Sequence, residues 1–389
     1  MPFVAEPNFQ HGGPSRTGVL LINLGTPDAP TVPAVRRYLA EFLSDPRVVE
    51  IPRLLWWPIL HGVILRSRPA RSAQRYASIW TDEGSPLLAQ SQRVAKRLQG
   101  ELGQRGRPMT VRLAMRYGNP SVAAGLDALK ADGATRILLL PLYPQYAAAT
   151  TASALDAAAA WSARCRWLPE FRAINHYHDD PGYIAALAAS VREHWMRVGP
   201  LAAAKAPPPP PEGVSRLGSG PALPRQGKAD VLVISFHGLP ARSLDLGDPY
   251  HCECHKTARL LAGSLGLAEK DYRVTFQSRF GRAKWLQPYT EPSVQALARD
   301  GHARIDVVCP GFATDCLETL EEISQEVRNA FIGAGGKEFH YIPCLNDGDR
   351  WISALTDLVL RHVQGWDTVA APTAAAGSAS RAKAMGAKA

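Results

Sequence analysis

Cysteine is scarce in this 389-residue sequence, which contains six. A small secreted domain held together by disulfides carries many more per residue, so we expect cytosolic thiols or metal ligands. Residues 1–16 are polar and lack the apolar segment of a secretory signal. The uncharged apolar run Leu54–Leu65 is short of the roughly 20 residues that cross a bilayer. These absences predict a cytoplasmic protein without a membrane-spanning helix.

Nucleotide-binding motifs are also missing. No G-x-G-x-x-G follows the first apolar run, and G-x-x-x-x-G-K-[ST] occurs nowhere, so dinucleotide and nucleoside triphosphate sites lack support. The formal net charge is +9, but the arginines are dispersed and part of the surplus lies near the C-terminus. A nucleic-acid-binding protein needs its basic residues on one face, so no nucleic acid partner is expected.

Short apolar runs recur along the chain, each bounded by glycine or proline and followed by a helical pattern. They are Val19–Leu24, Val111–Met115, Ile137–Leu140, Val231–Phe236, Arg273–Phe276 and Ile305–Val308. Continuously apolar strands that alternate with helices are typical of parallel sheets covered on both faces. The predicted fold class is therefore α/β with doubly wound, Rossmann-like sheets.

An internal repeat indicates that the fold contains two such lobes. The pattern A-L-x-x-D-G-x-x-R-I occurs at residues 128–137 and 296–305. Arg116-Tyr117-Gly118 has an echo in Arg279-Phe280-Gly281, and Gly25-Thr26-Pro27 has one in Gly238-Leu239-Pro240. Three similarities in the same order favour a duplicated βαβ lobe over chance.

The repeat also suggests domain limits. The first lobe is expected at 17–176, with about 50 extra residues that form a lip insertion near 40–90. The second lobe is expected at 177–345, with a proline-rich insertion at 199–228. A helix over 346–366 is expected to pack back on the lobes. Residues 1–16 are expected to be flexible, and the Ala/Gly/Ser/Lys-rich tail 367–389 disordered.

Polar residues that follow the strands are the candidates for chemistry, because ligands of doubly wound sheets bind at the carboxyl ends of strands. His237 ends the apolar run 231–236. It could bond to a neighbouring backbone group, or it could face a cleft and take a proton or a metal near neutrality.

An acidic segment follows the last predicted strand. Glu318 and Glu322 are four residues apart and would share one face of a helix, with Asp315 just before them. Acidic residues also suit the first turn of a helix, where the macrodipole stabilises them. A row of carboxylates that points into a cleft would instead serve metal ions or departing protons.

The run Leu54–Leu65 contains Trp56 and Trp57 and is followed by Arg66, Arg68 and Arg71. It is expected to form an exposed apolar lip beside cationic groups, suited to an apolar anionic ligand or to peripheral contact with a membrane. The alternative is an amphipathic helix packed on the sheet.

The segment His251-Cys252-Glu253-Cys254-His255 has the composition of a metal motif. A zinc site normally needs a second ligand pair at matching spacing, and none is visible. The sequence therefore favours a motif without a metal, although it leaves a metal site open.

Several short motifs together resemble the ferrochelatase family over about residues 17–365. They are Asn23-Leu-Gly-Thr-Pro27, Gly84-Ser85-Pro86-Leu87, Arg116-Tyr117, Tyr143-Pro-Gln-Tyr146, Ser235-Phe-His-Gly-Leu-Pro240, Gln277-Ser278-Arg-Phe-Gly281 with Trp285, and Phe312-Ala-Thr-Asp315 through Glu318-Thr-Leu-Glu321-Glu322. The combination of His-Gly-Leu-Pro with Glu-Thr-Leu is specific. The resemblance implies two Rossmann-like lobes with a porphyrin cleft between them.

The resemblance also implies roles for single residues. His237 and Glu318 would bind the incoming Fe²⁺ and receive the two pyrrole protons, and Glu322 and Asp315 could extend a proton or metal path. The porphyrin would be bound by residues at the family's pocket positions, which are Leu24, Ser85, Arg116, Tyr143, Trp285 and Phe312.

The implied reaction inserts Fe²⁺ into protoporphyrin IX and releases two protons, the last step of haem synthesis. Leu24 and the tryptophan-rich lip favour protoporphyrin IX over coproporphyrin. A chelatase for another tetrapyrrole and a non-catalytic porphyrin carrier remain alternatives. The cysteines do not match the spacing of the family's [2Fe–2S] ligands, so no tightly bound cofactor is expected. Cys316 stands where many relatives carry histidine, and the sequence does not set an oligomeric state.

Overall fold

The computed structural model describes residues 3–7, 15–199, 229–281, 283–366, 377 and 380–386. The proline-rich insertion lies outside these residues apart from Gly199, and most of the expected flexible N-terminus and disordered tail lie outside them as well.

The first half of the chain forms a four-stranded parallel sheet in the order β2-β1-β3-β4. Its strands are β1 (Arg16–Gly25), β2 (Thr110–Tyr117), β3 (Ala134–Pro141) and β4 (Glu170–Ala173). Its flanking helices are α4 (Pro86–Gln104), α5 (Val122–Ala131), the π-helix η2 (Ala148–Ala152) and α6 (Ser153–Ser162). Val19 and Leu21 of β1 belong to one buried cluster, and Leu20 and Ile22 to another, so both faces of the sheet are covered.

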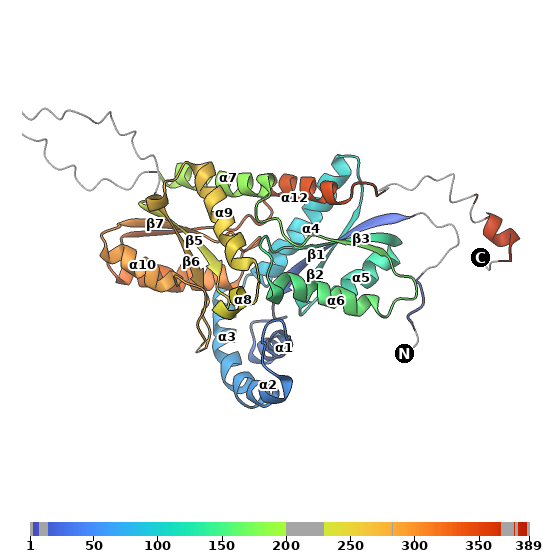
Figure 1. The fold of residues 1–389 in the computed structure, drawn as a ribbon, viewed down its shortest axis with the longest axis horizontal. Helices are drawn as coiled ribbons and strands as arrows, with labels where there is room; N and C mark the ends of the chain where they lie inside the picture. Colours follow the sequence, from blue (N-terminus) through green and yellow to red (C-terminus); the bar gives the residue numbers. More distant parts are fainter. Residues whose placement is uncertain are drawn as a thin grey trace, which may run out of the picture.

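The second half repeats this arrangement in the order β6-β5-β7-β8, again all parallel. Its strands are β5 (Val231–His237), β6 (Tyr272–Gln277), β7 (Arg304–Val308) and β8 (Glu338–Ile342). Its helices are α8 (Ala241–Asp245), α9 (Tyr250–Leu265), the 3₁₀ helix η3 (Glu269–Asp271), α10 (Thr290–Arg299), the π-helix η4 (Glu318–Val327) and α11 (Arg328–Gly333). The predicted fold of two duplicated α/β lobes is confirmed (Figure 1).

The register corrects one of the three predicted similarities. Asn23 pairs with Met115 in the first sheet, and Phe236 pairs with Phe276 in the second. Met115 and Phe276 also make matching backbone contacts: Met115 donates its N–H to the carbonyl of Pro120, and Phe276 donates its N–H to the carbonyl of Pro288. The structural counterpart of Arg116 is therefore Gln277. Arg279-Phe280-Gly281 lies in the loop beyond β6. The prediction that it corresponds to Arg116-Tyr117-Gly118 was therefore wrong, although the two sequences are similar.

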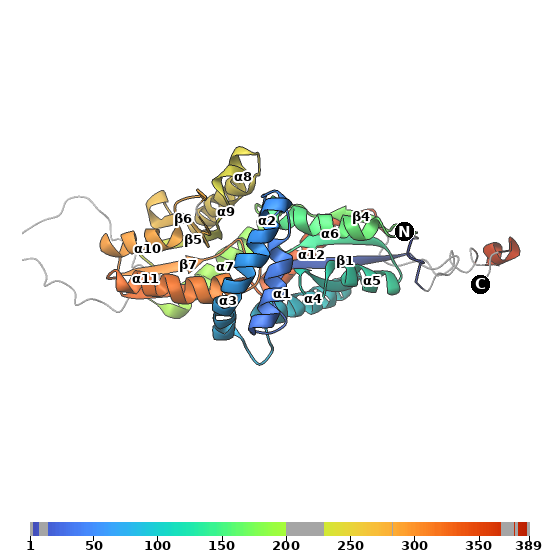
Figure 2. The same cartoon turned by 90° about the horizontal axis from the view of Figure 1, so that it is seen from below.

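The extra residues of the first half fold into helices that project from the body of the molecule (Figures 1 and 2). These are α1 (Val32–Leu43), α2 (Arg53–Ile59), the π-helix η1 (Leu60–Ile64) and α3 (Leu65–Ile79). They share one apolar cluster, in which Tyr38, Trp56 and Tyr76 pack around Tyr117 at the end of β2. The projecting helices are thus anchored on the carboxyl end of the first sheet.

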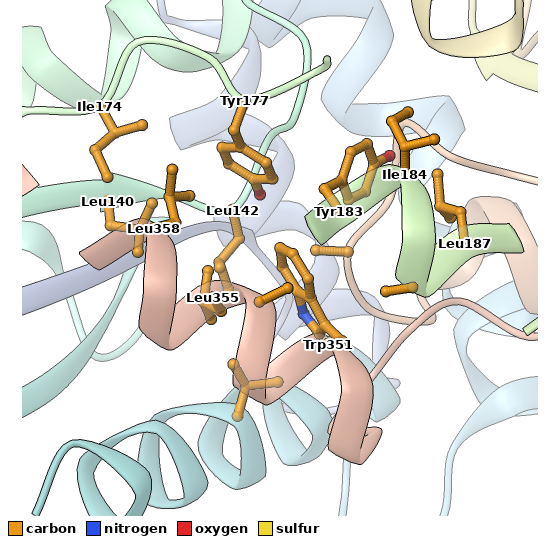
Figure 3. Close-up of a cluster of buried hydrophobic side chains, with 14 of the residues drawn as sticks. Leu140, Leu142, Ile174, Tyr177, Tyr183, Ile184, Leu187, Trp351, Leu355 and Leu358 are labelled. Carbon is orange, nitrogen blue, oxygen red and sulfur yellow. The ribbon is translucent and has the colours of Figure 1, made fainter. Parts of the chain in front are cut away.

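Two long helices join the halves. The helix α7 (Pro181–Val198) packs against α9, and α12 (Asp349–His362) packs against both α4 and α7. Figure 3 shows the buried side chains at this junction, where Trp351 of α12 stacks on Tyr177 with ring centroids 5.8 Å apart. Leu140 of the first sheet and Ile234 of the second belong to the same cluster, so a single apolar core spans both lobes.

Glycines at the ends of β1 and β5 allow the neighbouring strands to approach closely. Gly25 has φ +117°, and a Cβ there would lie 1.8 Å from the carbonyl oxygen of Tyr117. At the matching position, a Cβ on Gly238 would lie 2.7 Å from the carbonyl oxygen of Gln277. Only glycine satisfies the geometry at Gly25, and it sets the direction in which the chain leaves the strand.

Candidate functional site

The carboxyl ends of the two sheets meet through a buried amide. Asn23, near the end of β1, donates from Nδ2 to Ser91 Oγ and to Thr314 Oγ1, both at 3.0 Å. Thr314 follows β7, so this bond joins segments 291 positions apart. Residues that follow the strands of both lobes are therefore brought to one region.

His237 is the last residue of β5 and is half-buried. Its Nδ1 lies 2.7 Å from the carbonyl oxygen of Gly238, and its own carbonyl accepts a 2.9 Å bond from Tyr250 Oη. A carbonyl only accepts, so Nδ1 carries the proton in the neutral ring and Nε2 keeps a lone pair. The bond to a neighbouring backbone group, which the sequence left open, is present, and it leaves Nε2 uncommitted.

Glu318 begins η4, and the main chain there is held from the neighbouring strand. Gln277 Nε2 donates to the Glu318 carbonyl at 2.9 Å, and Gln277 Oε1 accepts from Ser235 Oγ at 2.8 Å. The segment was expected to be an ordinary helix, but it is a ten-residue π-helix. Helices of this i→i+5 type are frequent at functional sites. The buried amide fixes where the acidic segment begins.

Glu322 is held by Ser278, the residue that follows β6. The serine donates its backbone N–H to Oε1 at 2.7 Å and its hydroxyl to Oε2 at 2.5 Å. Burial raises the pKa of Glu322 and the nearby Glu318 adds to the rise, whereas Ser278 and His237 act to lower it. His237, Glu318 and Glu322 are thus electrostatic neighbours. Ser278 has φ +64°, which marks it as a strained position beside this group.

Asp315 is buried, and protein donors surround its carboxylate. Tyr341 Oη and Asn346 Nδ2 donate to it at 2.5 and 2.7 Å, and Thr319 Oγ1 lies 3.2 Å from Oδ1. These bonds tie the start of η4 to the end of β8. The structure therefore places Asp315 among contacts that position Glu318.

The projecting helices contribute side chains around Glu318. Burial raises the pKa values of Tyr38 and Tyr76 well above their ordinary range, and the charge of Glu318 contributes to both shifts. Burial lowers the pKa of Arg68, while Glu318 opposes that shift. The guanidinium of Arg68 lies 4.5 Å from the ring centre of Phe280. Two phenols and a guanidinium from the first lobe thus neighbour the key carboxylate of the second.

Tyr143 lies in the same aromatic region. It is buried, and among the described residues its hydroxyl has no hydrogen-bond partner. Burial raises its pKa well above the ordinary value, and Tyr117 and Tyr38 contribute. A buried hydroxyl without a partner is costly, so Tyr143 Oη is a natural contact for a ligand.

Arg116 is engaged within the protein. Its Nη2 donates to Asp45 at 2.5 Å, and its Nε donates to Ser153 Oγ at 2.6 Å. Burial raises the pKa of Asp45, but hydrogen bonds from Ser153, Arg47 N–H and Tyr117, together with the charge of Arg116, outweigh it and lower the pKa. The guanidinium of Arg116, which the resemblance places at the porphyrin pocket, is thus paired with a carboxylate of the chain itself.

The remaining predicted pocket residues are Leu24, Phe312, Trp285 and Ser85. Leu24 packs against the apolar cluster of the projecting helices, which Leu317 also contacts. Phe312 lies with its ring centre 6.4 Å from that of His237. Trp285 packs near Gly238, and among the described residues its Nε1 has no partner. Ser85 is buried at the N-cap of α4, where its hydroxyl does not cap the helix.

Cys316 is buried, and its pKa is raised well above the ordinary value by burial and by the neighbouring Glu318. The side chain is therefore a neutral thiol near neutrality, and a thiolate ligand is disfavoured at this position.

The run Leu54–Leu65 is helical, and it is only partly the exposed lip that was expected. Leu54 is 91% exposed and Trp57 is 50% exposed. Trp56 is buried and donates from Nε1 to the carbonyl of Leu43 at 2.7 Å, so the expectation of two exposed tryptophans was wrong. Adjacent residues of a helix point in different directions, which separates the pair. Among the described residues, no helix combines the length and apolarity needed to cross a membrane.

Sequence reasoning missed several residues of the site. Tyr38 and Tyr76 carried no local signal, because aromatic residues in an insertion read as ordinary packing. Arg68 was noted only as part of a basic flank. Ser278 was noted only within a motif, although its position directly after a strand could have singled it out.

Comparisons with known proteins agree with this arrangement. The family model described as ferrochelatase matches residues 16–363. The ferrochelatase of Methylibium petroleiphilum is 60% identical over 391 residues, covering 100% of both chains. That of Polaromonas sp. is 59% identical over 393 residues with the same coverage, and that of Dechloromonas aromatica is 54% identical over 389 residues, covering 100% of this chain and 99% of the other.

Among solved structures, SirB from Bacillus subtilis with Fe³⁺ superposes with a TM-score of 0.50. It is 13% identical, with 90% of this chain and 96% of that chain covered, so this likeness concerns the fold alone. Family membership follows from two findings: the family model matches residues 16–363, and relatives of high identity match over the full length. The chain belongs to the ferrochelatase family, the enzymes that insert iron into a porphyrin in haem synthesis.

Proposed function

We propose that this enzyme inserts Fe²⁺ into protoporphyrin IX, giving protohaem and two protons, and that His237 and Glu318 meet the metal and accept the protons. The observation that carries this proposal is the grouping of His237, Glu318 and Glu322 at the carboxyl end of the second sheet. It offers a free imidazole nitrogen and two carboxylates in one place, which suits both a base and a divalent cation.

The reaction needs groups that accept protons as the metal enters. Each pyrrole N–H must lose its proton before the nitrogen can bind iron. Nε2 of His237 is available because Nδ1 is committed to Gly238. Glu322 has a raised pKa, so it holds a proton more readily than an exposed glutamate. We assign the two protons to His237 and the Glu318–Glu322 pair, and we assign Asp315 to positioning η4.

The porphyrin is proposed to lie against residues of both lobes. Leu24 supplies an apolar surface, and Tyr143 supplies a buried hydroxyl without a protein partner. Phe312 and Trp285 flank His237. Arg116 is paired with Asp45, so its proposed contribution is to position this wall, and Ser85 is proposed to line it.

Protoporphyrin IX is proposed over coproporphyrin because the first-lobe wall is apolar. Leu24 stands at the end of β1 and packs with the aromatic cluster of the projecting helices. A porphyrin with fewer carboxylates suits such a surface better than one with four. The half-buried Arg68, close to Glu318, is a candidate to neutralise a propionate.

We propose peripheral contact with the cytoplasmic face of a membrane through α2 and η1. Leu54, Leu55, Trp57, Ile59 and Val63 are all at least 44% exposed. Arg53 and Arg66 flank them and are also exposed. An apolar helix face beside cationic groups suits an anionic lipid surface. Loss of binding to anionic vesicles in Leu54→Asp, with insertion into soluble porphyrin unchanged, is the expected outcome.

We further propose that no [2Fe–2S] cluster is held. The described cysteines are all free, and Cys254, Cys309 and Cys316 are buried with raised pKa values, for which burial is the main cause. Buried neutral thiols dispersed in the core do not make a cluster site. Iron content and the visible spectrum of the purified protein test this point.

The test of the function is anaerobic metallation followed by optical absorption, with protoporphyrin IX and coproporphyrin III compared in parallel. Glu318→Gln is expected to slow insertion by about 10²- to 10⁴-fold while porphyrin still binds. Glu326→Gln is the matched control, because Glu326 lies on the same π-helix but is exposed and paired with Arg75. Faster turnover of coproporphyrin would correct the substrate, and tight binding without insertion would leave a carrier.

A further inference from the structure

One cluster of ligand-type side chains lies apart from the proposed insertion site. His176 and His178 lie in the segment between β4 and α7, and Glu253 lies on α9. One candidate ligand atom from each residue lies within 4.8 Å of the other two. Within the described residues, this is the one such group of three or more histidine, cysteine or acidic side chains.

The contacts converge on the carboxylate of Glu253. His176 Nδ1 lies 2.6 Å from Oε1, and His178 Nδ1 lies 3.3 Å from Oε2. The backbone N–H of Tyr146 donates to Oε2 at 2.7 Å and holds the carboxylate in place. Glu253 is only 6% exposed, so its orientation is fixed by these neighbours.

His178 shows that protein contacts do not complete the cluster. It is 5% exposed, yet among the described residues its Nδ1 makes no hydrogen bond of acceptable geometry, and its contact is the 3.3 Å approach to Glu253 Oε2. A buried imidazole nitrogen without a hydrogen bond is unfavourable, and a cation bound between the two side chains would satisfy it. His178 Nε2, on the other side of the ring, lies 3.9 Å from Asp179 Oδ2, which gives it a nearby carboxylate.

The structure also explains why the motif 251–255 gave an ambiguous signal. His251 and His255 share one face of α9 and pack on Phe276, with ring centroids 5.6 and 6.1 Å from it. Glu253 lies between them in sequence and therefore points to another side of the helix. Cys254 is fully buried. Only Glu253 of this motif belongs to the cluster, and its partners come from a distant segment.

We propose that His176, His178 and Glu253 form a second divalent-metal site, selective for a borderline ion such as Zn²⁺ and separate from the insertion site. Two imidazoles and one carboxylate form a known protein ligand set for Zn²⁺, with a fourth position left for water. The half-exposed ring of His176 provides access from solvent.

The site joins elements that the fold brings together from far apart. A metal there ties the segment before α7 to α9, next to Tyr146 in the loop between β3 and η2. One turn before Glu253 on α9, Tyr250 donates to the carbonyl of His237. The metal therefore stabilises the helix that supports the end of β5.

The experiment measures Zn²⁺ binding by the full-length protein after removal of metal with a chelator. The insertion site is first disabled with the double variant His237→Ala/Glu318→Gln, so that bound Zn²⁺ reports the second site. We expect one equivalent of Zn²⁺ and a rise in Tm on its addition. Adding His176→Ala is expected to weaken binding by at least about 100-fold and to remove the Tm rise.

His251→Ala in the same background is the matched control and should leave Zn²⁺ binding unchanged. His176 is half-exposed, so its variant is expected to fold, and circular dichroism verifies this. Glu253→Gln provides a second test on α9. Absence of bound Zn²⁺ in the double variant, or binding that His176→Ala and Glu253→Gln leave unchanged, would overturn the proposal.

Discussion

The two lobes have the same strand order but carry different chemistry at equivalent positions. The strand registers make Leu24 of the first lobe equivalent in position to His237 of the second, and Arg116 equivalent to Gln277. Leu24 packs in an apolar cluster, whereas His237 presents a free imidazole nitrogen. Duplication of a fold thus sets where side chains are presented. In the function that we propose, the residue types at those places divide the work between holding a porphyrin and handling metal and protons.

A buried carboxylate in each lobe has a shifted pKa, and the two shifts have opposite directions. Asp45 in the first lobe is surrounded by donors and by Arg116, which lower its pKa against the effect of burial. Glu322 in the second lobe has a pKa that burial raises. The first environment stabilises a fixed negative charge, and the second favours a carboxyl group that binds protons.

The largest expected effect is the loss of stability on replacing the strand-end glycines, and it should differ between the two lobes. Gly25→Ala should destabilise the fold by about 4 kcal/mol or more, since a Cβ would overlap the Tyr117 carbonyl at a residue with φ +117°. Gly238→Ala should cost about half as much, because the nearest oxygen is 2.7 Å away. Gly106→Ala has a positive φ but open space around it and should cost about 1 kcal/mol. Urea unfolding ranks the three, and equal costs would refute the geometric account.

A second comparison uses Asp45→Asn and Glu322→Gln. Asp45→Asn leaves Arg116 without its charged partner and should destabilise the protein by about 3 kcal/mol at neutral pH. The contribution of Asp45 is present above its ordinary pKa and is lost as the pH falls through its lowered folded pKa. The stability gap between wild type and Asp45→Asn should therefore shrink in acid.

For Glu322→Gln, the stability gap between wild type and variant should change with pH in the opposite direction. A raised folded pKa contributes stability at low pH that is lost as the pH rises through that pKa. The neutral variant lacks this loss, so its stability relative to wild type should improve as the pH rises. Denaturant unfolding across pH 3–8 measures both slopes, and slopes of the same sign would contradict the contrast between the lobes.

The smallest effect on stability is expected from the exposed ion pairs between the projecting helices and the second lobe. Arg75 of α3 lies 3.6 Å from Glu321 and also pairs with Glu326, but its side chain is 41% exposed. Arg75→Ala should cost less than about 1 kcal/mol, and the cost should fall further at high salt. Unfolding at low and high salt tests this. A cost of several kcal/mol would mean that this ion pair, rather than the apolar core, holds the lobes together.

Much of the fold could be predicted because buried parallel strands leave a plain apolar pattern. The strands β4 and β8 escaped prediction, since Glu170–Ala173 is short and polar and Glu338–Ile342 alternates at a sheet edge. The likeness of Arg279–Gly281 to Arg116–Gly118 misled because local sequence does not show where a strand stops pairing. Register depends on contacts with the neighbouring strand.

The candidate site was predictable where a polar side chain stands at the end of a strand, as His237 does at the end of β5. It was not predictable where a side chain arrives from elsewhere. Tyr38 and Tyr76 reach Glu318 only because the projecting helices pack on the end of β2. Likewise, Glu253 lies 77 positions after His176 in the sequence, so no local motif reveals that it contacts His176 and His178. Long-range packing decides these contacts.

The most direct test of the divided roles compares His237→Ala with Leu24→Ala, the variants at equivalent strand ends. Porphyrin affinity is measured by fluorescence titration, and the insertion rate by anaerobic absorption. His237→Ala is expected to slow insertion by about 10²- to 10⁴-fold with porphyrin affinity unchanged. Leu24→Ala is expected to weaken porphyrin binding by about tenfold while insertion at saturation is largely retained. Loss of porphyrin affinity in His237→Ala, or loss of saturated insertion in Leu24→Ala, would contradict the divided roles.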